Sequence, residues 1–497
     1  MTREVAPEHE VVVIGAGFGG IAAAAKLRES GFRDVVVFEE ADELGGTWRE
    51  NTYPGCACDV PSALYSYSFA PNPDWTRMYA GNAEIHDYLR RTADDLGVTG
   101  LIRFGTKVES AHWDDLDLTW RLETSAGAVT ARWVVAACGP LHRPSMPDIA
   151  GIDTFEGTLF HSARWNHEHD LRGRRVAVLG TGASAIQFVP EIQPLVDSLT
   201  IFQRTAQWVL PKPDRHVGDR ERALYRRLPG AQRVMRRLTH LVFEAGTYGV
   251  RHPLVLRPLE WVSTAHMRRH ITDPALRRRV TVSTAMGCKR ILLSNRWYET
   301  LARPNVRVVD GDVRQIRPHS IVDGEGVEYE VDTLILATGY HAASPPVAEL
   351  FHDGRGRSMS AYFAEGGAQA YLGTTVAGFP NLFLLTGPNS FVYSSIVDVI
   401  EAQVDRLVTL LRYARHHTLG SVTVRPEIQR LFNDELQDAI AHTVWASGCS
   451  SWFMDDSGRN TTMWPWSTGE MRRRLGDVDP TDFELRPLNL MKDGVRR

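Results

Sequence analysis

Two short apolar runs in this chain each lead into a glycine-rich turn and then into a helix-like segment. The first is EVVVIGAGFGGIAAAAKL, which begins at Glu10, and the second is RRVAVLGTGASAIQFVPEI, which begins at Arg174. An apolar strand, a glycine turn and a helix in this order are typical of a nucleotide-binding unit. The pattern therefore predicts an α/β fold with two Rossmann-like dinucleotide-binding domains.

The first glycine turn carries Gly15, Gly17 and Gly20, and an acidic residue, Glu39, closes the next apolar run, VVVFE. Glycines are required because the turn is tight, the backbone approaches a pyrophosphate and the helix lies close to the strand. A carboxylate at this spacing can accept hydrogen bonds from ribose hydroxyl groups. The first unit is therefore predicted to bind an ADP-ribose group that lacks a 2′-phosphate.

The second turn, GTGASA, begins at Gly180 and has Ala185 in place of the third glycine. Glu39 lies 24 residues after Gly15, the first glycine of the first turn. The residue 24 positions after Gly180 is Arg204, and Thr205 follows it. A guanidinium offers fork-shaped donors to a phosphate, whereas a carboxylate would repel one. The second unit is therefore predicted to bind NADPH.

Other apolar strands indicate that the second unit is inserted into the first. ARWVVAACG (131–139) and VDTLILATGY (331–340) bracket the second unit, and NLFLLTGPN later returns to an apolar strand with a glycine turn. A first domain that closes only with C-terminal sequence is expected where a large cofactor such as FAD is buried. We predict an FAD-binding domain at 1–145, an NADP-binding domain at 146–330, and the second part of the FAD-binding domain with a C-terminal tail at 331–497.

A largely helical excursion is predicted within the second domain, at about residues 215–300. Its first part, DRERALYRRLPGAQRVMRRLTHLVF, is rich in arginine: Arg222, Arg226, Arg227, Arg233, Arg236 and Arg237. Such a face suits either water or a membrane surface. We interpret it as a solvated helix face, because Pro229-Gly230 interrupts the helix, and peripheral membrane contact is the less favoured alternative.

Composition and charge limit the class of protein. The 497 residues, 43% of them hydrophobic, are enough for more than one core. Lysine and arginine total 56 against 60 acidic residues, and the formal charge of −4 gives no basic field for nucleic acid. We see no export segment, no apolar run near the roughly 20 residues that span a bilayer, no disulfide framework and no metal-ligand cluster. These observations predict a cytoplasmic protein with small-molecule partners.

Two longer motifs resemble a known enzyme family. FEGTLFHSARWN (155–166) is similar to the fingerprint FxGxxxHxxxW of the type I Baeyer–Villiger monooxygenases and matches it through Trp165, while Asn166 departs from the usual Pro or Asp. GGTWRENTYPGCACD (45–59) is similar to their second signature. The resemblance to this branch of the flavin-containing monooxygenase superfamily covers nearly the whole chain. In that family the fingerprint lies where the two domains meet, so His161 is predicted to couple them without touching the flavin.

The resemblance implies an FAD-containing, NADPH-dependent monooxygenase that uses O2 to convert ketones to esters or lactones through a C4a-peroxyflavin. By the motif GCKRILLSN, Lys289 would contact the 2′-phosphate with Arg204 and Thr205, and Arg290 would lie over the flavin. A permanently charged guanidinium stabilises an oxygen anion there. Asp59 would orient Arg290.

The same motifs predict the remaining site residues. Three residues are expected to be catalytic, namely Arg290, Asp59 and His161. Further cofactor contacts in the FAD-binding domain are Gly46, Thr47, Trp48, Tyr65 and Val108. Further contacts in the NADP-binding domain are Thr181, Gly182, Ser184 and Gln187. The later stretch GPNSFVYSS, with Phe391 and Tyr393, is expected to border the cofactor and the substrate pocket.

Three alternatives stay open. Transfer of oxygen to amines or sulfides would make the chain an N- or S-oxygenating flavin monooxygenase. An NADPH-dependent flavin disulfide reductase would need a redox-active cysteine pair, and Cys56-Ala-Cys58 is the candidate, although one intervening residue makes a strained ring. An inactive flavoprotein that serves as a binding module is the third alternative, and the presence of Lys289, Arg290 and Asp59 argues against it.

Overall fold

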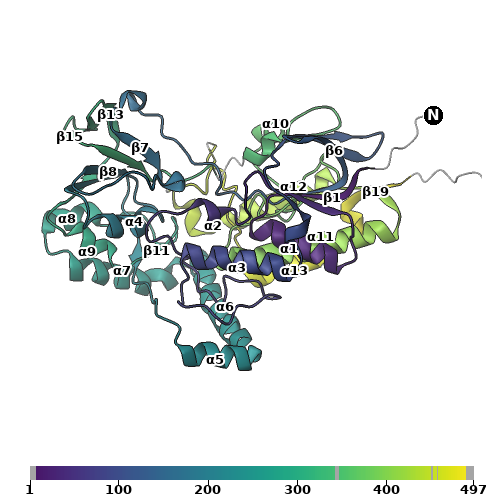
Figure 1. Ribbon diagram of the computed structural model, residues 1–497, viewed down its shortest axis with the longest axis horizontal. Helices are drawn as coiled ribbons and strands as arrows, with labels where there is room; N and C mark the ends of the chain where they lie inside the picture. Colours follow the sequence, from purple (N-terminus) through teal and green to yellow (C-terminus); the bar gives the residue numbers. More distant parts are fainter. Residues whose placement is uncertain (1–6, 342–345, 449–450, 456, 489–497) are drawn as a thin grey trace, which may run out of the picture.

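The computed structural model of the protein describes residues 7–341, 346–448, 451–455 and 457–488. The chain forms two lobes, and each is built around a sheet with parallel strands (Figure 1). Helices cover these sheets, as parallel strands require because both of their faces are apolar. The predicted α/β fold class with two dinucleotide-binding units is confirmed.

The first sheet combines N-terminal strands with two short strands that follow the second lobe in sequence. Its strands are β1 His9–Ile14, β2 Val35–Phe38, β3 Ile102–Arg103, β4 Val108–Asp114, β5 Thr119–Thr124, β6 Gly127–Ala136, β17 Phe351–His352 and β18 Leu382–Leu384. Their order is β17-β4-β5-β6-β1-β2-β3, and β18 also pairs with β6. Strands β3, β2, β1, β6 and β18 are parallel, whereas β4, β5 and β6 form an antiparallel meander.

Strand β1 is central because its side chains are apolar on both faces. Val11 and Val13 pack with the alanine-rich helix α1 (Phe18–Glu29), and Val12 packs on the opposite face with side chains of β4, β5 and β6. Helix α1 is in turn covered by α11 (Ile396–His416) and α3 (Asn82–Asp95). The C-terminal part of the chain thereby completes the core of the first lobe.

The first lobe contains further helices and one further pair of strands. Its other elements are α2 Thr47–Glu50, α10 Met359–Ala364, α12 Pro426–Ala441, α13 Thr468–Gly476, β19 Leu419–Val424 and β20 Phe483–Pro487. Strands β19 and β20 pair in an antiparallel manner, and α13 packs along α11.

The second sheet has five parallel strands in the order β12-β9-β8-β16-β7. They are β7 Thr158–His161, β8 Arg175–Leu179, β9 Ser198–Gln203, β12 Val306–Asp310 and β16 Thr333–Leu336. Helices α4 (Ala185–Ile192) and α9 (Trp297–Leu301) pack on one face, and a meander of β13 (Val313–Arg317), β14 (Ser320–Asp323) and β15 (Glu328–Glu330) packs on the other. Strand β16 belongs to this sheet, although the sequence analysis assigned residues 331–340 to the other domain.

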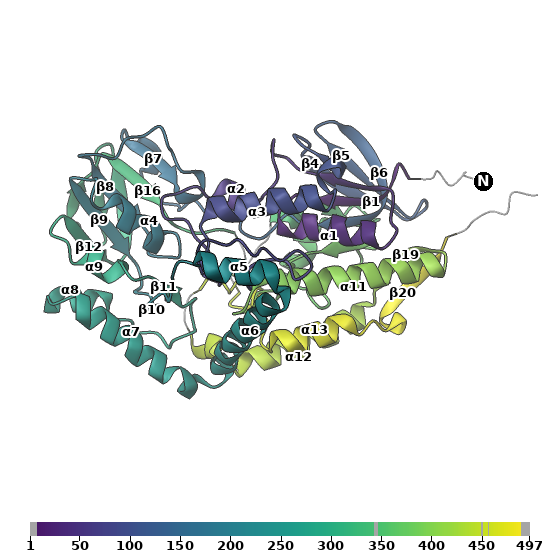
Figure 2. The same ribbon diagram turned by 60° about the horizontal axis from the view of Figure 1, so that its bottom comes forward.

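The predicted helical excursion comprises α5 Asp219–Arg227, α6 Pro229–Arg251, α7 Arg257–His270 and α8 Pro274–Val280, with a 3-10 turn η4 at Pro253–Leu256. Two short strands, β10 Val209–Leu210 and β11 Leu292–Leu293, pair across its base. Pro229 is the first residue of α6, where a missing N–H breaks no helical bond. In Figure 2, α7 lies at the lower left of the molecule, and α6 runs from there up toward α5 near the centre.

None of the described helices is long and apolar enough to cross a membrane. Cys56, Cys58 and Cys138 carry free thiols, and Cys288 takes part in a disulfide that the sequence analysis did not predict.

Candidate active site

A cavity of about 480 Å³ lies between the two lobes and is lined by both. Twelve of the predicted site residues line it: Gly15, Gly17, Glu39, Gly46, Thr47, Trp48, Asp59, Tyr65, Val108, Ser184, Gln187 and Arg290. The others lie outside this lining: Gly20, His161, Gly180, Thr181, Gly182, Arg204, Thr205 and Lys289. The cavity lies at the carboxyl ends of parallel strands, where nucleotides bind in α/β sheets.

The glycines of the first turn are explained by close backbone contacts. Gly15 has a φ of +100°, and a Cβ atom there would lie 2.7 Å from the carbonyl oxygen of Ala137. A Cβ atom on Gly20 would lie 1.8 Å from the carbonyl oxygen of Gly15. A Cβ atom on Gly17 would lie 3.7 Å from the Cα atom of Gly46. The start of α1 therefore opens into a glycine-lined cradle that fits a pyrophosphate.

The Glu39 carboxylate is buried at the end of β2. Its Oε2 atom accepts a hydrogen bond from the Ala16 N–H at 2.7 Å, and Oε1 accepts one from the Ala41 N–H at 3.1 Å. Burial raises the pKa of Glu39, and these two hydrogen bonds oppose the rise. The carboxylate is thus fixed in the cavity wall, where it can accept hydrogen bonds from ribose hydroxyl groups.

Aromatic side chains form another part of the wall. Trp48 Nε1 donates a hydrogen bond to the Tyr65 hydroxyl at 3.1 Å. The Tyr65 ring meets Phe18 edge to face, with the ring centroids 5.2 Å apart. Val108 begins β4 and is buried. The predicted contacts around the first nucleotide site therefore form one packed wall rather than separate surface positions.

The second glycine turn repeats the geometry of the first. Gly180 has a φ of +103°, and a Cβ atom there would lie 2.5 Å from the carbonyl oxygen of Ala337. A Cβ atom placed on Gly182 would have no described atom within 4 Å apart from those of its chain neighbours. Ala185, which stands in the third position, is fully buried as the first residue of α4. The second turn thus accommodates a methyl group at the position where Gly20 of the first turn leaves no room for one.

Two cations gather beside the second turn. Arg204 follows β9 and is exposed, and the half-buried Lys289 comes from the loop before β11. Burial lowers the pKa of Lys289, and the positive charge of Arg204 lowers it further. The charge of Arg204 thus acts on Lys289, and the half-buried Thr205 follows Arg204 in the sequence. Paired cations of this kind suit a phosphate group.

Arg290 and Asp59 join the two lobes within the cavity. The Nε and Nη2 atoms of Arg290 both donate to Asp59 Oδ2, at 2.9 and 2.6 Å. The Asp59 charge raises the pKa of Arg290 above its usual value. The Arg290 side chain stays 40% exposed, so donors remain available to a ligand. The structure thus brings together the two residues that the sequence placed 231 positions apart.

The loop that carries Asp59 is held from the second lobe. Gln187 of α4 accepts a hydrogen bond from the Ala57 N–H at 3.2 Å, and its Nε2 atom donates to the Ala57 carbonyl at 2.9 Å. Lys212 Nζ donates to the Cys58 carbonyl at 3.1 Å. Sequence analysis missed Lys212, which lies outside every motif and is identified only by this contact.

The loop that carries Arg290 is held from the first lobe. The Gly287 carbonyl accepts hydrogen bonds from the Tyr393 hydroxyl at 2.6 Å and from Trp445 Nε1 at 3.1 Å. The rings of Tyr393 and Trp445 are stacked, with centroids 6.2 Å apart. Tyr393 was expected to border the cofactor, whereas Trp445 was not predicted and had no sequence signal.

His161 ends β7 and is buried outside the cavity lining. Its Nδ1 atom accepts a hydrogen bond from the Ala163 N–H at 3.0 Å. Burial and the nearby charge of Arg164 lower the pKa of His161 to about 4. Its ring meets Tyr340 edge to face, and the Tyr340 hydroxyl donates to Asn51 at 2.7 Å. Since Tyr340 and Asn51 line the cavity, they connect the buried His161 to the site.

A second histidine forms a charged junction at the rim. His142 places one ring nitrogen 2.8 Å from Glu40 and the other 2.8 Å from Glu50, and Arg164 lies 3.5 Å from Glu50. The hydrogen bonds to Glu40 and Glu50 raise the pKa of His142 to about 9. The three groups could also ligate a metal ion, but both ring nitrogens already face carboxylates, as in an ion pair. No motif marks this junction in the sequence.

The cysteine pair does not fit a redox-active dithiol. Burial raises the pKa of Cys56 to about 11 and raises that of Cys58 further above the ordinary range. The thiolate is the reactive form of cysteine. The surroundings of the pair therefore argue against the disulfide reductase alternative.

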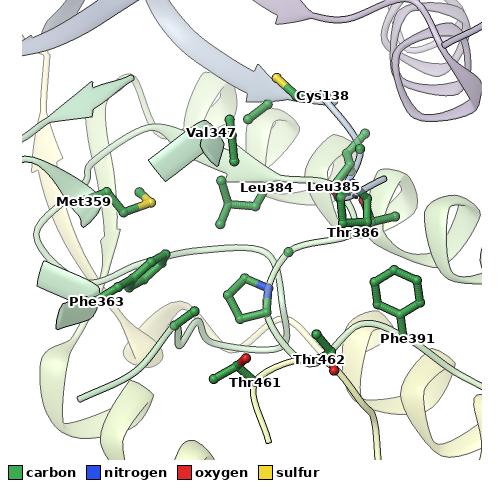
Figure 3. Close-up of a pocket in the computed structure, with 16 residues that line it drawn as sticks. Cys138, Val347, Met359, Phe363, Leu384, Leu385, Thr386, Phe391, Thr461 and Thr462 are labelled. Carbon is green, nitrogen blue, oxygen red and sulfur yellow. Dashed lines mark hydrogen bonds between the residues drawn. The ribbon is translucent and has the colours of Figure 1, made fainter. Parts of the chain in front are cut away.

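A smaller cavity of about 40 Å³ adjoins the first one at the end of β18. The two cavities share Cys138 and Phe391 in their linings. In Figure 3, Met359, Phe363 and Leu384 enclose one side of the smaller cavity. The lining of the smaller cavity is mainly apolar. This cavity was not predicted from the sequence.

Comparison with known proteins agrees with this geometry. Residues 8–362 match the family model described as flavin-binding monooxygenase-like. The chain is 46% identical, over 98% of its length and 94% of the relative's, to a Baeyer–Villiger monooxygenase of Streptomyces coelicolor. It is 40% identical, over 100% of its length and 95% of the relative's, to one of Pseudomonas aeruginosa.

Solved structures give the same result. A steroid monooxygenase bound to NADP superposes with a TM-score of 0.86 at 30% identity, over 97% of this chain and 100% of that one. Cyclohexanone monooxygenase from Rhodococcus sp. Phi1, bound to NADP+, superposes with a TM-score of 0.86 at 29% identity, over 96% and 99% of the two chains. A structure named OTEMO, in complex with FAD and NADP, also has this fold. The chain belongs to the flavin-binding monooxygenase-like family and is an FAD-containing, NADPH-dependent monooxygenase of the Baeyer–Villiger type.

Proposed function

We propose that this chain converts ketones into esters or lactones, and that Arg290 and Asp59 carry the oxygen-transfer step. The observation that supports this most directly is their ion pair at 2.6 Å in the cavity where the two lobes meet. It places a permanent positive charge beside the glycine cradle of the first lobe and next to the loop of Lys289.

The two lobes would hold different cofactors. The cradle of Gly15, Gly17 and Gly46, together with Glu39, fits FAD, because it combines a pyrophosphate site with a carboxylate that suits a free ribose. The second turn fits NADPH, because Arg204, Thr205 and Lys289 suit a 2′-phosphate. When bound, FAD accepts a hydride from NADPH and activates O2 for transfer to a carbonyl carbon.

Arg290 would stabilise the negative charge that develops on oxygen during transfer. A guanidinium stays charged at every physiological pH and offers several fixed donors. Asp59 takes up two of these donors and fixes the plane of the group. Donors that are already oriented in a site shielded from water stabilise developing charge without a cost of reorganisation. Gln187, Lys212, Tyr393 and Trp445 would act as positioning residues, because each holds one of the two loops.

The same arrangement favours ketones over amines and sulfides. Attack on a carbonyl needs an anionic oxygen, which the Arg290 charge favours, whereas transfer to nitrogen or sulfur needs a protonated one. N- or S-oxygenation is therefore the second candidate.

A product assay separates the two candidates. The holoenzyme would be given NADPH and O2 with a panel of linear, cyclic and steroidal ketones, and in parallel with thioethers and tertiary amines. We expect esters or lactones to form in proportion to NADPH consumed. Sulfoxides or N-oxides with no ester from any ketone would overturn the proposal.

A further inference from the structure

Exposed apolar side chains are concentrated in the helical excursion. Among the residues that the structure describes, 19 large apolar side chains are exposed, and 12 of these lie between Leu224 and Trp261. Most single exposed apolar residues need no explanation, but a contiguous group of this size marks a docking surface. We call the outward side of α6, η4 and α7 the α6–α7 surface.

Helix α6 carries exposed apolar side chains on the side that faces away from the protein. On its inward side Gln232 donates to the Asn72 carbonyl at 2.6 Å and Arg236 donates to the Leu64 carbonyl at 3.1 Å, while Phe243 and Val250 pack against apolar side chains. Its outward side is apolar, with Leu241 59% and Val242 70% exposed. A helix that only covered the protein would have the opposite arrangement. These apolar side chains of α6 therefore point away from the core and are not covered by the described chain.

The apolar surface continues past the end of α6. Leu254 in the turn η4 is 70% exposed, and Trp261 in α7 is 73% exposed. Tryptophan is favoured at membrane–water interfaces, where its ring meets hydrocarbon and headgroups together. The exposed apolar side chains thus continue from α6 through η4 into α7 as one apolar edge. The ends of α6 and α7 that η4 joins lie at the lower side of the molecule in Figure 2.

Arginines surround this apolar edge. Residues 219–280 hold 14 arginines, no lysine and five acidic residues, in a chain whose formal charge is −4. Arg233, Arg237, Arg251 and Arg257 are exposed next to the apolar side chains. The sequence analysis favoured a solvated helix face because Pro229-Gly230 interrupts the helix, and it did not weigh the apolar residues that lie between the arginines.

We propose that the α6–α7 surface docks on the surface of an anionic lipid bilayer. Apolar side chains bordered by basic ones are what such a surface binds, since the apolar groups enter the headgroup region and the cations pair with lipid phosphates. A second copy of this chain is a poorer occupant, because a symmetric contact would bring the two arginine clusters together. The surface lies on the bilayer and does not cross it.

Docking would involve the elements that support the Arg290 loop. Leu256 of η4 lies against Gly287, where a Cβ atom would be 3.3 Å from its Cδ1 atom. Glu260 of α7 accepts a hydrogen bond from the Met286 N–H at 3.4 Å. The lipid-facing side of η4 and α7 is thus backed by the loop that leads to the active site.

Vesicle flotation of the purified holoenzyme tests the proposal. The probes are vesicles of phosphatidylcholine alone and vesicles of phosphatidylcholine with an equal amount of phosphatidylglycerol. One variant combines Leu238→Ser, Leu241→Ser and Val242→Ser, and a second combines Arg233→Glu and Arg237→Glu. Leu116→Ser is the matched control, because Leu116 is 83% exposed in the turn between β4 and β5 of the first lobe. FAD content and NADPH oxidation check that each variant is folded.

We expect the wild type and the control to float with the anionic vesicles and not with phosphatidylcholine alone. Each variant should lower the bound fraction by at least about tenfold, and raised salt should release the wild type. The proposal fails if the wild type binds neither vesicle, or if the triple serine variant binds as well as the wild type. A wild-type dimer that the serine variant converts to monomer would also overturn it and assign the surface to a second copy.

Discussion

The two glycine turns share a backbone but differ in the side chain that selects the nucleotide. Gly15 and Gly180 have φ values of +100° and +103°, and each lies against the carbonyl of an alanine that follows a neighbouring strand. At the equivalent later position, however, Glu39 is buried and Arg204 is exposed. Under the proposed function, the shared backbone would hold a pyrophosphate in both turns, whereas the side chain at this later position would favour a ribose hydroxyl in the first and a phosphate in the second.

The turns also differ in the space available at their third position. In the first turn the third glycine lies against the carbonyl of Gly15, and in the second turn Ala185 replaces it. Helix α1 is buried between its sheet and α11. The shorter α4 lies where its lobe meets the loop of Asp59, which Gln187 of α4 contacts. The first site is thus built into the core, and the second is built at a junction.

The largest effect is expected where the two sites meet. Arg290→Ala should lower ester formation by about 10²–10³-fold, because the charge that stabilises the developing anion is lost. NADPH oxidation should continue and yield hydrogen peroxide, since neither nucleotide site is changed. Product and peroxide would be measured together, with Arg278→Ala, an exposed arginine of α8, as control. Undiminished ester formation would remove Arg290 from the mechanism.

The third glycine offers a matched pair of substitutions. Gly20→Ala places a methyl group 1.8 Å from a backbone oxygen, so it should destabilise the fold by about 1–3 kcal/mol or more and release FAD. Ala185→Gly should cost only about 0.5–1 kcal/mol, because it adds freedom to a helix without creating a clash. Urea unfolding and retained FAD are the readouts. Equal costs for the two changes would contradict the difference between the turns.

Substitutions of Arg204 and Lys289 test whether the second turn prefers NADPH to NADH. Arg204→Ala and Lys289→Ala should each raise the KM for NADPH by about 10- to 100-fold, since each removes a charged hydrogen-bond donor. The KM for NADH should stay nearly constant, because NADH has no 2′-phosphate. Steady-state kinetics with both nucleotides measure the effect. A parallel rise for NADH would mean that these residues support the fold instead.

The smallest effect concerns the two histidines near the junction. In the folded protein the pKa of His142 is about 9, above its ordinary value of roughly 6.5. The ion pairs of His142 therefore stabilise the protein fully below pH ~6.5. This stabilisation is lost as the pH rises through 9. His161 has a pKa lowered to about 4, so its burial disfavours the folded state only as pH falls below ~6.5. The Tm of His142→Gln should therefore trail the wild type at pH 6 and approach it at pH 10. A gap that is constant with pH would argue against the charged junction.

Short sequence motifs were enough to predict the fold class and much of the candidate site. The glycine turns, Glu39, Arg204 and the Arg290–Asp59 pair were all predicted, because each rests on a motif of short spacing or on a family fingerprint. Lys212, Trp445 and the His142 junction were missed, because their partners lie far away in sequence and only the folded chain brings them together. Strand β16 was assigned to the wrong lobe for a related reason, since an apolar run does not indicate which sheet it joins.

The most direct test of the account is a labelled turnover. The holoenzyme would be reduced with NADPH without oxygen, then mixed with ¹⁸O2 and a ketone that it accepts, and the product analysed by mass spectrometry. The account predicts an ester or lactone that carries one ¹⁸O atom for each NADPH consumed, and Arg290→Ala should abolish most of it. Unlabelled ketone recovered intact, with one hydrogen peroxide formed for each NADPH, would contradict the central claim.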